Sequence, residues 1–139
     1  MKLSLFYCLV FLSVVANAQQ NLVKYVKPLI GTEKMGHTYP GATVPFGMLQ
    51  VSPDNGVSSW DWCSGYHYSD AIVAGFSHLH LSGTGIGDLA DILFMPTNKK
   101  LDLTVKTTSR DQLPYKSKYS HANEKAAPGS YQVFLEDPK

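Results

Sequence analysis

The sequence predicts an antiparallel all-β fold. Its apolar segments are short, none has a sustained 3.6-residue period, and Gly and Pro lie between them. The 139 residues, 44% of them hydrophobic, suffice for one buried core and not for two. A formal net charge of +1 argues against a nucleic-acid-binding face, and the apolar content argues against disorder.

The first expected element is a secretory signal peptide, residues 1–18. Lys2 precedes the apolar run Leu3–Val15, and the small residues Ala16–Ala18 place the cleavage after Ala18. This run is shorter than the roughly 20 residues that span a bilayer, so we expect no membrane span after processing. The exported domain, residues 19–139, would be periplasmic, at the cell surface or secreted, with Cys63 as its single thiol.

The exported part contains five strand-like segments. Two of them alternate apolar and polar residues, and one, residues 71–81, is rich in β-branched and aromatic residues. The other two are apolar runs, one with Pro45 and Gly47 inside it and one stopped by Pro96. A polar stretch, residues 107–129, has a lysine cluster and Pro128-Gly129, and it predicts a loop or an irregular excursion. The chain stops directly after an apparent strand with no closing element to pair with it, so we expect a truncated all-β domain. The predicted strands are residues 44–51, 71–81, 92–95, 101–105 and 131–135.

The first glycine-rich loop, residues 36–43, has Gly36, His37 and Tyr39 on a turn fixed by two glycines and a proline. Binding residues often lie on such loops. A purely structural turn explains the glycines equally well.

The second loop, Trp60–Asp70, interleaves aromatic residues with Asp61, Ser64 and His67. This pattern suits a sugar, whose ring face stacks on an indole while its hydroxyls bond to polar neighbours. Core aromatics with incidental polar neighbours are the alternative. Cys63 has no adjacent base that would make it a nucleophile, and a free Cys usually behaves as a small buried hydrophobe.

The third loop, residues 76–88, carries His78 and His80. On a strand both would face the same side and could bind a metal with Asp88 or Asp91. Such histidines more often bond to the backbone and tie a loop. The spacing of the glycines in this loop does not match a dinucleotide-binding fingerprint.

Five motifs in order are more specific than any single residue: Tyr25-Val26-x-Pro28-x-Ile30-Gly31-Thr32, Gly36-His37-Thr38-x-Pro40-Gly41-Ala42, Val44-Pro45-Phe46-Gly47-Met48, Trp60-Asp61-x-Cys63-Ser64-Gly65-Tyr66-His67-Tyr68, and Gly75-Phe76-Ser77-His78 through Leu81-Ser82-Gly83-Thr84-Gly85. Together they closely resemble the amino-terminal domain of glycoside hydrolase family 92, a family of exo-acting α-mannosidases. The likeness runs from about Leu22 to the end of the chain.

This resemblance implies a two-domain enzyme. A β-sandwich would precede a larger (α/α)6 barrel, absent here, and the active site would lie in the cleft between them. Family members are inverting and calcium-dependent, with a Glu general acid and an Asp general base on the helical domain. No residue of this chain is therefore assigned as catalytic or as a metal ligand, and the Ca²⁺ ligands are expected mainly outside it.

The resemblance also assigns this chain the sandwich side of a pocket for a mannose-containing glycan, with Trp60 as the stacking residue. The implied partner is the missing helical domain, and no nucleic acid is expected. The substrate-binding residues implied are Gly36, His37, Trp60, Asp61, Cys63, His67, His78 and His80.

Three interpretations remain open. The chain could be the non-catalytic half of a secreted α-mannosidase, a free-standing carbohydrate-binding module, or an inactive fragment that aggregates through open strand edges.

Overall fold

The structure of the chain is a computed structural model that describes residues 21–43, 47–56, 59–81, 92–101, 104 and 112–136. The expected signal peptide with Ala18, the candidate ligands Asp88 and Asp91, and most of the predicted strand 101–105 lie outside these ranges. Among the described residues, no helix is long and apolar enough to cross a membrane.

All regular strand pairing in the described ranges is antiparallel, which confirms the all-β prediction. The short helices there are 3-10 turns: η1 (Leu22–Tyr25), η2 (Trp60–Trp62) and η4 (His121–Asn123). The strands form three pairs: β1 (Ser52–Asp54) with β3 (Gly75–Ser77), β2 (Ile72–Val73) with β4 (Ser117–Lys118), and β5 (Glu124–Ala127) with β6 (Ser130–Val133).

The predicted strand boundaries are partly wrong. The segment 71–81 forms two strands separated at Ala74, whose N–H bonds to Asp54. Within 44–51 the described part has only the bridge of Val51 to Ala42, and within 92–95 only Phe94 pairs, with Phe76. The strand predicted at 131–135 is present as β6, which starts one residue earlier and ends two residues earlier, at Val133.

The loop predicted for residues 107–129 is wrong in its described part, because β4, η4 and β5 all lie inside it. β5 pairs with β6 through the turn Pro128-Gly129, in the register Ala127 to Ser130. Its side chains alternate between the interior and solvent, but Ala and Lys at these positions hide the alternation from a hydrophobicity pattern.

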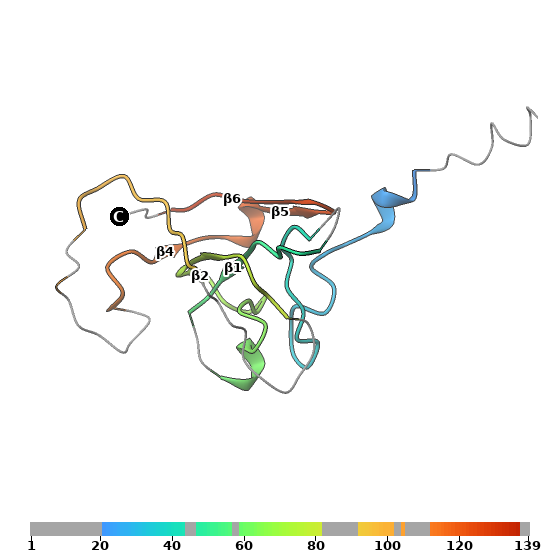
Figure 1. The fold of residues 1–139 in the computed structure, drawn as a ribbon, viewed down its shortest axis with the longest axis horizontal. Coiled ribbons are helices and arrows are strands. Elements are labelled where there is room, and N and C mark those ends of the chain that lie inside the picture. The colour runs from blue at the N-terminus through green and yellow to red at the C-terminus, as the bar shows by residue number, and fades with distance from the viewer. Residues whose placement is uncertain are drawn as a thin grey trace, which may run out of the picture.

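Figure 1 shows the hairpin of β5 and β6 along one side of β1 and β2, while the η2 turn projects from the opposite side. The apolar core between these elements is small, with Tyr66, Val73 and Tyr119 at its centre. Buried polar side chains outnumber buried apolar ones in the described residues. Hydrogen bonds between these polar groups therefore hold much of the interior together.

Candidate functional site

The η2 turn presents an indole and a carboxylate to solvent. Trp60 is 52% exposed, and Asp61 beside it is also exposed, whereas Cys63 is buried. Backbone bonds from Cys63 N–H to Trp60 and from Gly65 N–H to Trp62 close the turn. A large exposed aromatic residue on a closed turn is a surface that can stack on a ligand ring.

Gly65 ends this turn with a φ of 80°. A Cβ at this position would lie 2.6 Å from Asp54 Oδ1 and 2.8 Å from His80 Cε1, so no larger residue fits. The turn is therefore seated directly on the buried side chains of Asp54 and His80.

His37 lies under Trp60. The two rings meet edge to face with centroids 5.5 Å apart, and His37 Nδ1 lies 3.2 Å from Cys63 Sγ. The φ of His37 is 49°, in the left-handed region that bulky residues seldom adopt. Its Nε2 is buried with no hydrogen-bond partner in the described part of the chain, and such atoms often mark functional sites.

His67 ties the loop before His37 to the same turn. Its Nε2 accepts the backbone N–H of Lys34 at 3.1 Å, and Nδ1 lies 2.8 Å from Ser69 Oγ. Nδ1 also accepts the backbone N–H of Ser69 at 3.3 Å, so both ring nitrogens bond to atoms of the domain. The His67 ring also packs against Trp62, with centroids 4.7 Å apart.

His80 is 2% exposed and faces the interior. Its Nδ1 lies 3.0 Å from the carbonyl of Ser64 and must donate to it, and its Nε2 lies 2.9 Å from Ser77 Oγ. His80 therefore supports the turn from below, and both of its nitrogens already have protein partners.

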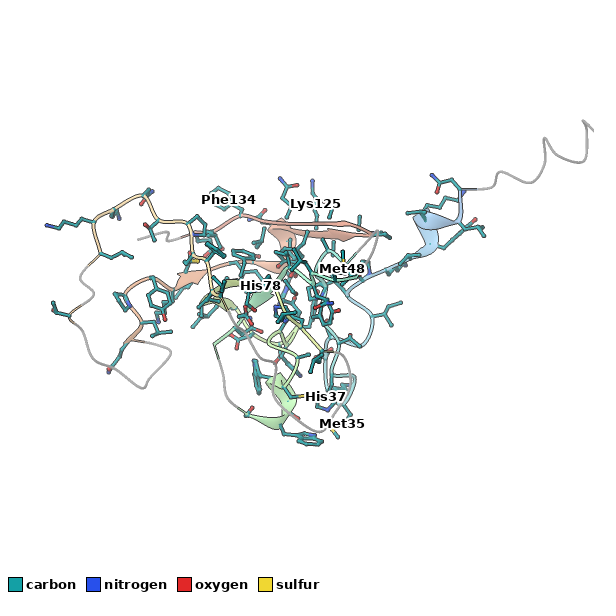
Figure 2. All side chains as sticks on the ribbon, viewed as in Figure 1. Met35, His37, Met48, His78, Lys125 and Phe134 are labelled. Carbon is teal, nitrogen blue, oxygen red and sulfur yellow. The ribbon has the colours of Figure 1, made fainter. Side chains whose placement is uncertain are left out.

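The two remaining predicted residues lie elsewhere in the loops. β3 ends at Ser77, so His78 and His80 do not share a strand face. Figure 2 shows His78 beside the strands and His37 at the opposite end with η2. Gly36 packs closely on the preceding turn, because a Cβ there would lie 2.0 Å from the carbonyl oxygen of Gly31.

The structure adds polar residues that the sequence did not single out. Asp70 accepts the Trp62 indole N–H at 3.0 Å, which fixes that ring. Asn55, fully buried, accepts the His67 N–H at 2.6 Å and donates to the Ile72 carbonyl at 2.7 Å. The Asp54-Asn55-Gly56 turn signature was the available signal for Asn55.

Three buried tyrosines around Glu124 are held protonated. Burial is the main cause that raises the pKa of Tyr66, Tyr119 and Tyr131 well above the usual value, and the nearby Glu124 carboxylate raises each further. These hydroxyls therefore act as neutral groups around Glu124 at any physiological pH.

A calcium ion needs several oxygen ligands, usually carboxylates. In the part of the chain that the structure describes, no three or more His, Cys, Asp or Glu side chains gather as a metal site. Asp54, Asp70 and Glu124 instead accept hydrogen bonds inside the domain. These residues alone do not fit a calcium site.

A groove of about 880 Å³ lies between the N-terminal segment and the tip of the β5–β6 hairpin. Val23, Ile30, Tyr68 and Ala126 are among its lining residues. None of the predicted substrate-binding residues lines this groove, so it is separate from the η2 turn.

An all-β domain that presents an indole and a carboxylate on a buried polar support has the features of a carbohydrate-binding surface. Residues 25–139 match the family model described as the glycosyl hydrolase family 92 N-terminal domain. The chain thus belongs to glycoside hydrolase family 92, as its sequence motifs predicted.

The chain is also similar to solved structures of family 92 enzymes. The family GH92 alpha-mannosidase of Bacteroides thetaiotaomicron matches with a TM-score of 0.76 and 43% identity, over 86% of this chain and 16% of that one. A family GH92 inverting mannosidase of the same organism matches with a TM-score of 0.61 and 30% identity, over 87% and 16% of the two chains. An uncharacterized secreted glycosidase of Arthroderma benhamiae is 39% identical over 72 residues, which are 52% of this chain and 9% of that protein. The chain thus spans a small fraction of the length of its relatives.

Proposed function

We propose that this chain supplies the N-terminal side of the mannose pocket in an exported, exo-acting and inverting α-mannosidase. The observation that carries the proposal is the exposed indole of Trp60 beside the Asp61 carboxylate, on a turn supported by His37 and Cys63. The Bacteroides alpha-mannosidase that this chain resembles has also been solved in complex with mannoimidazole, which supports a sugar ligand.

In this proposal the Trp60 ring stacks on the apolar face of a mannose unit, and Asp61 accepts hydrogen bonds from its hydroxyls. His37 and Cys63 lie behind the indole and fix its position. His67 and His80 act from beneath the turn, since their nitrogens bond to protein atoms.

The general acid and base are proposed to come from outside this chain. An inverting glycosidase needs two carboxyl groups roughly 6.5–9.5 Å apart, with room for a water between substrate and base. The carboxylates Asp54, Asp70 and Glu124 are buried and accept hydrogen bonds within the domain. The Ca²⁺ proposed for the complete enzyme would likewise take its ligands mainly outside this chain.

A graft tests this function. Residues 25–139 replace the matched segment of the Bacteroides alpha-mannosidase, and mannose release is measured for the folded hybrid. Activity near that of the parent supports the proposal, whereas a folded hybrid that binds no mannose analogue contradicts it.

A further inference from the structure

Glu124, the first residue of β5, has a carboxylate buried in the domain. Its side chain is 1% exposed. Oε1 accepts hydrogen bonds from the Tyr66 hydroxyl at 2.8 Å and the Tyr131 hydroxyl at 2.6 Å, and Oε2 lies 2.6 Å from His121 Nδ1. Burying a charge costs free energy, and these three donors offset that cost.

The donors to Glu124 come from separate parts of the chain. Tyr131 lies on β6 and His121 on η4, whereas Tyr66 directly follows Gly65 at the end of the η2 turn. Tyr68 adds a second link, because its ring stacks on His121 with centroids 4.0 Å apart and an interplanar angle of 19°. The segment after the tryptophans is thus joined twice to the cluster around Glu124.

The link to the tryptophans is short. Gly65 N–H donates to the Trp62 carbonyl, and Asn55 N–H donates to the Gly65 carbonyl. A shift of Tyr66 would therefore be passed through Gly65 to Trp62 and to the exposed Trp60.

Docking the hairpin does not by itself require a charge. Val133 and Leu135 pack against the core from the same part of the chain, and apolar residues at a buried site often give equal or greater stability than ions. A network whose members are all bonded does, however, select one arrangement of the groups that it joins.

We propose that Glu124 is a positioning residue for the tryptophan-bearing turn, and that its carboxylate holds Tyr66 so that Trp60 and Trp62 keep their orientation. The proposal rests on the proposed function only where Trp60 is taken to contact sugar. The positioning itself is a property of this chain and is measured without substrate.

Tryptophan fluorescence of the whole chain is the test. The sequence has 2 Trp, both in η2, so emission and acrylamide quenching report on this turn alone. Glu124→Ala is expected to shift the emission to longer wavelength and to increase quenching, although Glu124 lies on β5. Glu124→Gln keeps an acceptor for both tyrosine hydroxyls and is expected to restore most of the protection.

Two further variants separate positioning from general loss of stability. Val133→Ala weakens the same hairpin without removing a bond to Tyr66. It is expected to quench like the unsubstituted chain when each protein is measured at a temperature equally far below its own unfolding midpoint. If Glu124→Ala does not fold, Tyr66→Phe still tests the proposal. It deletes only the hydroxyl that bonds to Glu124, and it is expected to increase quenching. Quenching of Tyr66→Phe equal to that of Val133→Ala overturns the proposal.

The outcome is independent of the enzyme assay. If Trp60→Ala leaves the kinetics of the hybrid unchanged while Glu124→Ala increases quenching, the sugar-contact proposal fails and the positioning role stands. If Trp60→Ala lowers kcat/KM of the hybrid while Glu124→Ala leaves quenching unchanged, the positioning role fails and the sugar-contact proposal stands.

Discussion

His37 and Cys63 form a buried pair beneath an exposed tryptophan, with the imidazole Nδ1 3.2 Å from the thiol sulfur. The pair joins two loops that are 26 residues apart in the chain. Since the ring of Trp60 lies against the same imidazole, the position of the exposed indole depends on both loops.

The buried pair predicts a protected thiol. Beyond residue 18, Cys63 is the single cysteine of the sequence, and it is 7% exposed. We expect an aromatic disulfide reagent to modify it slowly in the folded chain and rapidly in denaturant. Trp60→Ala should speed the reaction and Phe134→Ala, at an exposed site on the hairpin side, should not. Modification of the folded wild-type chain at the denatured rate would contradict the packing.

Asn55 predicts a stability effect. Asn55→Asp keeps the shape but places a carboxylate oxygen against the Ile72 carbonyl in place of the amide donor. We expect a loss of about 1–3 kcal/mol in the free energy of unfolding, since a buried acceptor is left unpaired. Asn123→Asp, at an exposed position, is the matched control, and both are measured by urea denaturation. Equal stability of the two variants would argue against the Asn55 network.

The buried tyrosines predict a loss of stability in alkali. The folded domain raises the pKa of Tyr66, Tyr119 and Tyr131 above the unfolded value, chiefly by burial, so it retains protons that the unfolded chain releases. Stability is therefore fully present below about pH 10 and falls as the pH rises beyond it. Urea midpoints and tyrosinate absorbance across this range measure the effect. Titration of all tyrosines before unfolding would contradict it.

The isolated chain and the hybrid enzyme are expected to respond differently to removal of calcium. A chelator is expected to abolish mannose release by the hybrid and to leave the unfolding midpoint of this chain unchanged, because its described residues form no metal cluster. Stabilisation of the isolated chain by calcium would place ligands in this half.

The loop at Trp60–Asp70 could be singled out from the sequence, because its aromatic and polar residues are adjacent in the chain. The 3-10 turn η2 within it and its bonds to Asn55 and Asp70 were not predicted. His37 and Cys63 were both singled out, but no local pattern showed that they touch. The role of His80 was not predictable either, since it depends on Ser64 and Ser77 meeting around one imidazole.

The hairpin of β5 and β6 shows the limit of sequence patterns most clearly. Lys125 and Ala127 face solvent, Ala126 is half-buried, and Glu124 is buried at a position where charge predicts exposure. The burial of Glu124 is explained only by Tyr66, 58 residues away, and by Tyr131 and His121.

The measurement that tests the central claim most directly is the kinetics of Trp60→Ala in the hybrid that carries residues 25–139. Loss of the stacking surface is expected to lower kcat/KM about tenfold or more, equivalent to about 1.4 kcal/mol, chiefly through KM. Phe134→Ala, another exposed aromatic residue, should leave kcat/KM unchanged. A folded Trp60→Ala hybrid with the kinetics of the unsubstituted hybrid would contradict the assignment of this turn to the mannose pocket.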